Sequence, residues 1–321
     1  MKTEIYDTTL RDGSQQEGIS LTVGDKLRIA SLLDELGVDY VEGGWPGANP
    51  KDDEFFRRAQ KELGFGTATL VAFGSTRRPR GTVADDPQLQ ALLAADTEVI
   101  CIVGKSWDYH VREALRTDLD EGVRMVAESI EYLRNHDRRV FFDAEHFFDG
   151  YRTNPEFALR VLRSATEAGA ERLVLCDTNG GTLPSPILDT IGRIQEALPE
   201  SELGVHFHDD VGCAVASSLV AVDAGVRQVQ GCINGYGERT GNADFSTLIP
   251  DLVLKMGLPV LPEGKLELLG PVAHHVAEVV NIALDPHHPY VGTSAFTHKA
   301  GLHTSALARQ PDAYEHEDPS Q

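Results

Sequence analysis

The sequence predicts a (β/α)8, or TIM, barrel followed by a small C-terminal helical subdomain. Short runs rich in β-branched and aromatic residues alternate with longer stretches of helical periodicity, a pattern typical of repeated strand–helix units. Eight such runs occur, and spacings of roughly 25 to 40 residues leave room for one helix in each gap. An open doubly wound sheet usually has fewer strands, so the count favours a closed barrel.

The predicted strands follow one another in the first 264 residues, which we expect to form the catalytic barrel. They lie near EIYDTTL from Glu4, VDYVEGG from Val38, ATLVAFG from Ala68, EVICIVG from Glu98, RVFFDAE from Arg139, RLVLCDT from Arg172, LGVHFHD from Leu203 and VQGCING from Val229. TVGDKLRIASLLDELG and PEFALRVLRSATEAGA, before the second and sixth strands, have the apolar spacing of amphipathic helices.

The alternation stops after about Gly264, and residues 265–321 are expected to form a helical linker or lid subdomain. ELLGPVAHHVAEVVNIAL predicts one amphipathic helix, and HKAGLHTSALA predicts a short second one. The Pro/His/Gly-rich DPHHPYVGTSAF between them predicts a loop. The final YEHEDPSQ is expected to be disordered or to begin a further segment.

The charge balance excludes several classes of function. The chain carries 29 Lys+Arg against 50 Asp+Glu, a formal charge of −21, which repels nucleic acid and anionic membrane surfaces. The N-terminus has no apolar leader, and no run approaches the ~18 apolar residues of a membrane span, so we expect a cytoplasmic protein. Cys101, Cys176, Cys213 and Cys232 lack CxxC spacing and are interpreted as buried free thiols in preference to redox or zinc ligands.

Polar residues gather where the predicted strands end, which in a barrel is where the active site is built. Such clusters are Asp7-Thr8-Thr9-Leu10-Arg11-Asp12-Gly13, Asp143-Ala144-Glu145, Asp177-Thr178-Asn179, His206-Phe207-His208-Asp209-Asp210 and the run from Asn234 to Asn242. Reactive side chains from five strands are therefore expected at one end of the barrel.

His206 and His208 are two residues apart on a predicted strand, so both side chains should face the barrel axis. A single inward histidine is more often a hydrogen-bonded core residue, but two convergent imidazoles favour a metal site. Asp12 could add a neutralising carboxylate and Asn242 an oxygen. Mixed nitrogen and oxygen ligands suit Mn²⁺, Mg²⁺ or Zn²⁺, and the sequence does not choose among them.

Other rim residues have both a structural and a functional interpretation. Arg11 could pair with a neighbouring carboxylate or bind substrate, and Glu145 could close a polar ring or carry out acid–base chemistry. Gly235 and Gly237 could form a tight turn or let backbone amides approach a ligand. The basic run Arg77-Arg78-Pro79-Arg80 could be a solvated loop or could bind a phosphate-bearing ligand.

Four motifs along nearly the whole chain resemble the acyl-CoA-condensing branch of the DRE-TIM metallolyases. They are DTTLRDG, HxHxD, GxGERxGN and, near the end, FxHxxGxH from Phe296 to His303. This branch contains 2-isopropylmalate, homocitrate and citramalate synthases. GGWPGANPKDDEFF, after the second predicted strand, most resembles the bacterial (R)-citramalate synthase subgroup.

The resemblance implies a role for each matching residue. It implies that the metal ligands are Asp12, His206, His208 and Asn242, that Arg11 polarises the keto oxygen, and that Glu145 acts as an acid, base or water-orienting carboxylate. It also implies that Thr178 contacts the substrate carboxylate and that His303 and Tyr314 form a catalytic lid over a neighbouring protomer. Beside these motif residues, we expect Gln15 and Ile100 to contact the 2-oxo acid, and Gly235, Gly237, Arg77, Arg78 and Arg80 to contact acetyl-CoA. A homodimer with exchanged lids follows from the resemblance.

The implied reaction joins acetyl-CoA to pyruvate and releases citramalate and CoA. A 2-isopropylmalate synthase acting on 2-oxoisovalerate is the first alternative. A carbon–carbon lyase acting on a 3-hydroxy-3-methylglutaryl-CoA-like substrate and a non-catalytic barrel are the others.

Two features depart from the family pattern. Asp209 stands where the family usually has Asn, and it is expected to add negative charge near the metal. The chain also stops at Gln321, where these synthases commonly continue into a C-terminal regulatory domain.

Overall fold

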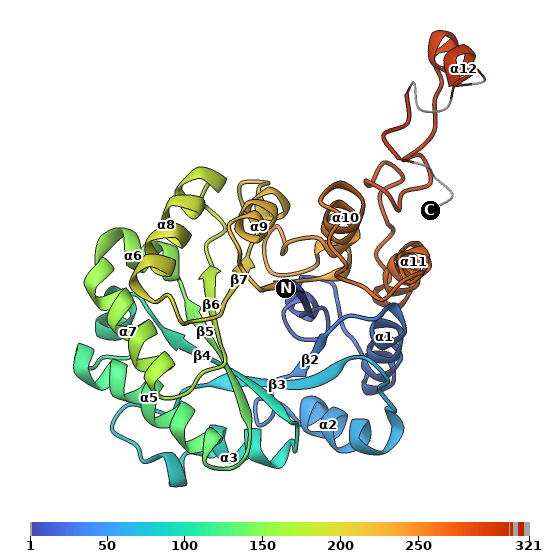
Figure 1. Ribbon diagram of the computed structural model, residues 1–321. Helices are drawn as coiled ribbons and strands as arrows, with labels where there is room; N and C mark the ends of the chain where they lie inside the picture. Colours follow the sequence, from blue (N-terminus) through green and yellow to red (C-terminus); the bar gives the residue numbers. More distant parts are fainter. Residues whose placement is uncertain (1, 308, 311–313, 318–321) are drawn as a thin grey trace.

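Eight parallel strands close into one barrel in the computed structural model, which describes residues 2–307, 309–310 and 314–317 (Figure 1). Each strand pairs with the next along the chain, and the last pairs with the first. The strands are β1 (Glu4–Asp7), β2 (Tyr40–Gly44), β3 (Thr69–Ser75), β4 (Val99–Lys105), β5 (Arg139–Glu145), β6 (Arg172–Asp177), β7 (Leu203–Phe207) and β8 (Gln228–Gly231). All eight predicted strands and the predicted fold class are confirmed.

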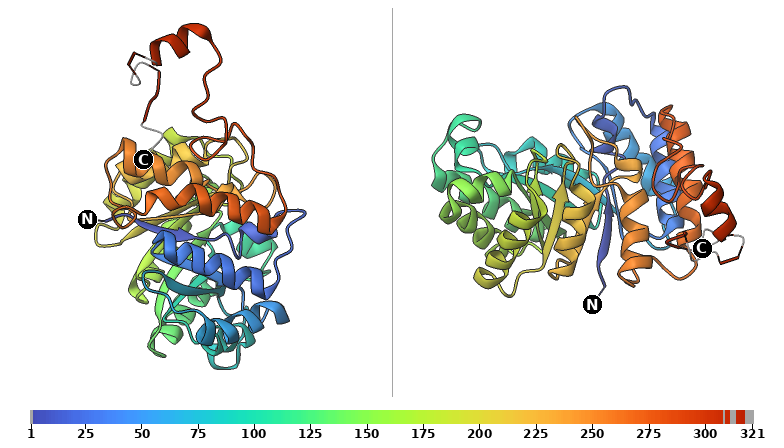
Figure 2. Two further views of the ribbon diagram at one scale, coloured as in Figure 1. Left: turned by 90° about the vertical axis from the view of Figure 1, so that its right-hand side faces the viewer. Right: turned by 90° about the horizontal axis from the view of Figure 1, so that it is seen from above.

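Helices surround the barrel on its outside (Figures 1 and 2). They are α1 (Val23–Leu36), α2 (Pro50–Glu62), α3 (Pro87–Ala94), α4 (Asp108–Glu113), α5 (Leu119–Arg134), α6 (Phe147–Thr153), α7 (Pro155–Glu167), α8 (Pro184–Ala197), α9 (Ala214–Asp223), α10 (Phe245–Pro250), α11 (Leu269–Val280) and α12 (Gly301–Leu307). The helices predicted before the second and sixth strands are confirmed as α1 and α7.

The ends of α1 follow from its sequence. Thr22 and Asp25 form a reciprocal capping box that satisfies backbone N–H groups at the N-terminus. Gly37 ends the helix at φ 94°, a left-handed conformation that costs glycine little. The chain can therefore turn at once into β2.

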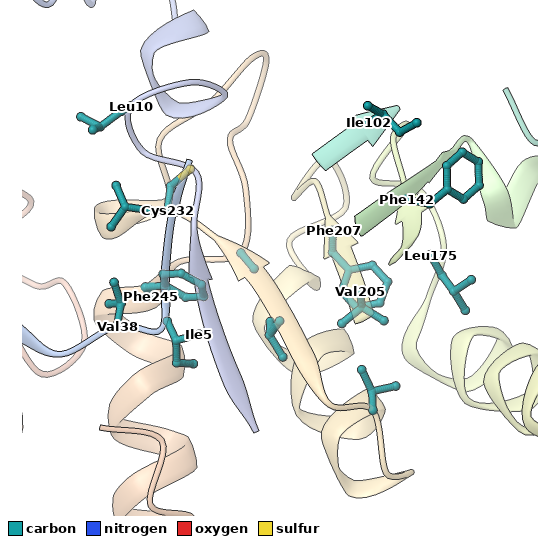
Figure 3. Close-up of a cluster of buried hydrophobic side chains, with 14 of the residues drawn as sticks. Ile5, Leu10, Val38, Ile102, Phe142, Leu175, Val205, Phe207, Cys232 and Phe245 are labelled. Atoms are coloured by element: carbon teal, nitrogen blue, oxygen red, sulfur yellow. The ribbon is translucent and has the colours of Figure 1, made fainter. Parts of the chain in front are cut away.

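The core has two layers because successive strand residues face opposite sides of the sheet. Outward-facing side chains such as Ile102, Phe142 and Val205 pack against the helices in one large apolar cluster (Figure 3). A smaller cluster that includes Tyr6, Tyr40, Val71, Phe73, Val99, Cys101 and Phe141 fills the barrel interior. Because these side chains fill the barrel interior, space for polar side chains remains at the carboxyl ends of the strands.

The segment after the barrel begins as part of the same core. Leu269, Val272 and Val276 of α11 belong to the large apolar cluster, and Asn281 ends the helix in a left-handed conformation. From there the chain has no helix until α12, which lies on an arm that extends away from the barrel (Figures 1 and 2). Both helices predicted after Gly264 are therefore confirmed, with α11 packed onto the barrel.

The four cysteines are free thiols. Cys101, Cys176 and Cys232 are buried as expected, whereas Cys213 is partly exposed because it lies in the loop before α9, not in a strand. Within the described ranges, none of the helices combines the length and apolar character needed to cross a membrane.

Candidate metal centre and active site

Asp12, His206 and His208 converge at the carboxyl end of the barrel, where their ligand atoms all lie within 4.8 Å of one another. Asp12 follows β1, His206 lies on β7, and His208 comes directly after that strand. The Nε2 atoms of His206 and His208 are 3.7 and 4.0 Å from Asp12 Oδ2. Because the three residues are buried, they form a preorganised group of possible metal ligands.

Asn242 completes this group. An isolated β-bridge pairs it with His208, and its Nδ2 donates to Asp12 Oδ1 and to the Tyr236 carbonyl. Its buried Oδ1 has no hydrogen-bond partner within the described part of the chain. An unsatisfied amide oxygen beside two imidazoles and a carboxylate fits a divalent cation with mixed nitrogen and oxygen ligands.

The electrostatics keep these groups in their ligating forms. Burial opposes ionisation of Asp12, but Arg11, His206 and His208 outweigh it and hold the Asp12 pKa well below its usual range. Burial lowers the pKa of His206, and burial together with His206 lowers the pKa of His208 to about 4. At neutral pH the carboxylate is therefore charged and both imidazoles carry a free lone pair.

Arg11 is fixed beside the ligands by three neighbours. Its Nε donates to Glu42 Oε2 at 2.5 Å, and its Nη1 donates to Asp12 Oδ2 at 2.8 Å. Its guanidinium carbon lies 3.8 Å from the centroid of the Phe73 ring. Glu42 in turn accepts a hydrogen bond from the Tyr6 hydroxyl at 2.7 Å. The two carboxylates outweigh the opposing effect of burial and raise the pKa of Arg11, which stays charged.

A cavity of about 380 Å³ opens over this group. Its lining includes nine of the residues predicted for the site: Arg11, Asp12, Gln15, Arg77, Arg78, Glu145, Thr178, His206 and His208. Glu145 contacts Lys105 Nζ, and Thr178 Oγ1 accepts a hydrogen bond from the His146 backbone at 2.9 Å. The structure thus gathers catalytic, substrate and metal candidates from β1, β5, β6 and β7 in one place.

Two family models cover most of the chain. The model described as HMGL-like matches residues 2–274, and the model described as homocitrate synthase post-HMGL domain-like matches residues 290–321. The chain belongs to the HMGL-like family.

Five of the relatives found carry the name (R)-citramalate synthase. An (R)-citramalate synthase of Streptomyces coelicolor is 56% identical over 315 residues, and one of Aquifex aeolicus is 53% identical over 318 residues. These alignments cover 98% and 99% of this chain but 59% and 60% of the relatives, so the chain spans about three fifths of their length. A probable 2-isopropylmalate synthase of Methanopyrus kandleri is 34% identical over 98% of this chain and 60% of its own length.

A solved structure has the same barrel fold. The HMG-CoA lyase of Bacillus subtilis superimposes with a TM-score of 0.74 at 20% sequence identity. The match covers 88% of this chain and 95% of that one. At this identity, the likeness supports the fold alone.

One predicted substrate residue of this HMGL-like chain lies elsewhere. Ile100 is fully buried in the large cluster between β4 and the helices, so it cannot form a wall of the cavity. The strand alternation explains the error, because Val99, Cys101 and Val103 face the interior and Ile100 faces outward. Val103 and Phe73 supply apolar surface to the cavity instead.

The basic run divides into one structural and two exposed arginines. Arg77 is 3% exposed, and it forms 2.7 Å ion pairs with Glu121 and Glu128 of α5. Arg78 is exposed and lines the cavity, whereas the exposed Arg80 does not line it. A role in binding acetyl-CoA stays a prediction, and Arg78 is the best placed of the three.

The glycine loop after β8 has a structural explanation. Gly235 and Gly237 have φ values of 65° and 153°, and a Cβ on Gly237 would overlap Asn242 Nδ2. Neither glycine lines the cavity. Their observed contribution is to let the loop close around Asn242, and contact with acetyl-CoA stays a prediction.

Asp209 does not point its charge at the ligand group. Its carboxylate accepts a 2.7 Å hydrogen bond from the Ala214 backbone N–H at the start of α9. Burial raises its pKa, and among the described residues it is outside the metal-binding cluster. The expectation of extra charge at the metal is therefore replaced by a role in capping a helix.

His303 and Tyr314 lie together but away from the cavity. Their rings stack with centroids 4.1 Å apart, and neither residue lines the cavity. α12, which carries His303, extends from the barrel (Figure 1). Their predicted role over a neighbouring protomer stays a prediction.

Sequence reasoning missed Glu42, Lys105 and Gln230. Glu42 is fully buried, and the available signal was an acid within the otherwise apolar VDYVEGG run. Lys105 ends β4 next to Glu145 of β5, a contact that depends on strand pairing. Gln230 lies beside His206 for the same reason.

Proposed function

We propose that this chain carries the active site of a citramalate-forming acyltransferase that condenses acetyl-CoA with pyruvate. The observation that carries the proposal is the Asp12–His206–His208 group, which shares one cavity with Arg11, Glu145 and Thr178. The choice of pyruvate rests on the relatives, because those named (R)-citramalate synthase are 48–56% identical to this chain. The relative named probable 2-isopropylmalate synthase is 34% identical.

The ligand group fits Mn²⁺, Mg²⁺ or Zn²⁺, held by Asp12, His206, His208 and Asn242. Such a cation would supply Lewis-acid polarisation of the 2-oxo acid and neutralise charge that develops on its keto oxygen.

Arg11 would orient the 2-oxo acid. Glu42 and Asp12 engage its Nε and Nη1, and no described residue hydrogen-bonds its Nη2. A guanidinium held on both sides can donate from Nη2 to a substrate oxygen without reorganising. Thr178 and Gln15, which line the same cavity, would contact the substrate carboxylate.

Glu145 would move the proton. It lines the cavity and contacts Lys105 Nζ, so its carboxyl group is placed to exchange a proton with a bound substrate. The methyl carbon of acetyl-CoA loses a proton and forms a bond to the keto carbon of pyruvate, whose C=O π bond opens to an alkoxide that takes up a proton and becomes the hydroxyl of the product. Water then cleaves the thioester and releases free CoA with the citramalate carboxylate.

We also propose a cytoplasmic homodimer in which His303 and Tyr314 of one protomer cover the cavity of the other. The arm extends from its own barrel, and the ring pair is partly exposed (Figure 1). Free thiols at all four cysteines are consistent with a reducing compartment.

The test measures release of free thiol from acetyl-CoA with pyruvate, 2-oxoisovalerate or 2-oxoglutarate, with and without Mn²⁺. We expect the fastest release with pyruvate and dependence on the cation. Faster release with 2-oxoisovalerate would identify a 2-isopropylmalate synthase instead. Cleavage of a 3-hydroxy-3-methylglutaryl-CoA-like substrate without condensation would support the lyase alternative. If His206→Ala releases thiol at the same rate as the wild type, the release does not depend on the ligand group, and this result would support the non-catalytic alternative.

A further inference from the structure

A line of buried hydrogen bonds runs from His206 away from the ligand group. His206 Nδ1 lies 2.9 Å from Gln230 Oε1, and Gln230 Nε2 donates to Asp143 Oδ1 at 3.0 Å. Cys101 Sγ donates to the same Asp143 oxygen at 3.2 Å. The four residues are at most 4% exposed, so solvent does not compete for these bonds.

Strand pairing explains why these residues meet. His206 of β7 is directly beside Gln230 of β8 in the sheet register. Asp143 belongs to β5, and its side chain reaches Gln230 across the barrel interior. Cys101 and Asp143 belong to the adjacent strands β4 and β5. The line therefore connects four strands behind the candidate metal centre.

The donors and acceptors along this line determine which ring nitrogen of His206 carries the hydrogen. Asp143 Oδ1 accepts hydrogen bonds from both Gln230 Nε2 and Cys101 Sγ, so the NH₂ end of the Gln230 amide faces Asp143. The carbonyl end of Gln230 must then face His206, and a carbonyl requires a donor. Nδ1 of the neutral imidazole therefore carries the hydrogen, and its Nε2 keeps the lone pair that faces Asp12.

We infer that Asp143 and Gln230 are positioning residues that select the Nδ1–H tautomer of His206 and hold its Nε2 ready for a cation. The inference rests on the proposed metal centre. It distinguishes the two histidines, because His208 Nδ1 is buried without a hydrogen-bond partner in the described ranges. His206 is then the ligand whose orientation is set before the cation binds.

The first experiment titrates Mn²⁺ into the full chain and follows free Mn²⁺ by electron paramagnetic resonance. Gln230→Met removes the acceptor with little change in volume, and we expect its affinity for Mn²⁺ to fall about 10- to 100-fold. Gln228→Met is the matched control, because Gln228 is equally buried two residues earlier on the same strand and bonds to Glu4. We expect this control to bind like the wild type.

A second variant exchanges the acid and the amide. Asp143→Asn combined with Gln230→Glu lets the new amide donate to the new carboxylate, which still accepts from His206 Nδ1. We expect this double variant to recover most of the affinity that Gln230→Met loses. Because both original side chains are replaced, recovery depends on the hydrogen-bond pattern and not on their identity.

Nitrogen-15 spectra of the metal-free protein report the tautomer directly. Wild type and the double variant should hold His206 as the Nδ1–H form, and Gln230→Met should populate the Nε2–H form. Melting temperatures confirm that each variant is folded.

The outcomes separate the two proposals. A wild-type chain that binds none of Mn²⁺, Mg²⁺ and Zn²⁺ overturns the metal centre and the inference together. If the wild type binds Mn²⁺ and Gln230→Met binds it equally well, the metal centre stands and the inference is wrong. A Gln230→Met protein that does not fold leaves the test to the double variant, whose failure to hold the Nδ1–H form overturns the inference.

Discussion

Glu42 Oε2 accepts a 2.5 Å hydrogen bond from Arg11 Nε, although the two residues are 31 positions apart in the chain. Glu42 is fully buried, and its second oxygen is bonded to Tyr6. One oxygen of the Glu42 carboxylate is therefore held by Tyr6, and the other orients the Arg11 guanidinium beside the cavity.

Replacement of this carboxylate should impair the reaction more than binding of the cation. We expect Glu42→Gln to lower kcat on the order of 100-fold, because a small displacement of Arg11 misaligns a reacting group. Mn²⁺ affinity should change little, since Asp12 keeps its bond from Arg11. The thiol-release assay and a metal titration measure the two effects. Glu128→Gln is the control, because Glu128 also pairs with an arginine but does not itself line the cavity, and a wild-type kcat for Glu42→Gln would contradict the prediction.

Glu145 should be essential for proton transfer and dispensable for metal binding. We expect Glu145→Gln to lower kcat by about 10²- to 10⁴-fold, the usual contribution of a general base. Mn²⁺ affinity should be unchanged, because Glu145 is outside the ligand group in the described chain. Glu238→Gln is the control, since Glu238 also lines the cavity. Equal loss of activity in both variants would remove the special role of Glu145.

Substitution of Arg78 should weaken binding of acetyl-CoA, whereas substitution of Arg77 should lower the stability of the fold. Arg78→Ala should raise KM for acetyl-CoA about tenfold with little change in kcat, as expected for loss of one charge-assisted hydrogen bond. Arg77→Ala should destabilise the fold by about 3 kcal/mol, because it leaves Glu121 without its buried partner. Arg80→Ala is the control for exposed charge. Initial rates and urea unfolding distinguish these results, and an unchanged KM in Arg78→Ala would exclude this part of the rim from acetyl-CoA binding.

Acid should weaken the contacts of Glu121 in a defined range of pH. Its hydrogen bond from Arg77, together with those from the Arg80 backbone and Arg124, outweighs burial and lowers its pKa from 4.5 to about 2. A carboxyl with a lowered folded-state pKa adds stability above its unfolded-state pKa and loses it as the pH falls toward the folded-state value. We expect Glu121→Gln to be about 1–2 kcal/mol less stable than wild type at pH 6, with this gap closing between about pH 5 and pH 2. A gap independent of pH in urea unfolding would disprove the assignment.

Exchange of lids between protomers predicts complementation. Arg11→Ala has an impaired barrel with an intact arm, and His303→Ala has an intact barrel with an impaired arm. When the two inactive proteins are unfolded together and refolded, half of the dimers are mixed and each contains one intact site. Activity should therefore recover to about a quarter of the wild-type value. Recovery to no more than the sum of the two separate variants would place the arm over its own barrel or outside catalysis.

The barrel and the histidine pair could be predicted because they depend on short-range patterns. The apolar runs define the strands, and the two-residue period of a strand places His206 and His208 on one face. The same period explains the error at Ile100, since a shift of one residue moves a side chain from the cavity to the outer core. Asp12 and Asn242 came from the motif resemblance, and the structure brings both to the histidines.

The remaining site contacts could not be predicted because they cross between strands or helices distant in the chain. Glu42 bonds to Arg11 across 31 residues, and Gln230 bonds to Asp143 across 87. The partners of Arg77 lie on α5, 44 and 51 residues later, so local patterns do not reveal that one arginine of the basic run is buried and paired with two carboxylates. These pairings require the closed barrel and its register.

Positions in and around the cavity differ in whether a substitution there would disturb the metal ligands. Gly237 does not line the cavity, yet any side chain there would displace Asn242 and disturb the ligand group indirectly. Val103 and Phe73, which give the cavity its apolar surface, belong to β4 and β3 and lie outside that loop. Substitutions on these two strands can therefore alter which acceptor the barrel admits, whereas a substitution at Gly237 would disturb the metal ligands themselves.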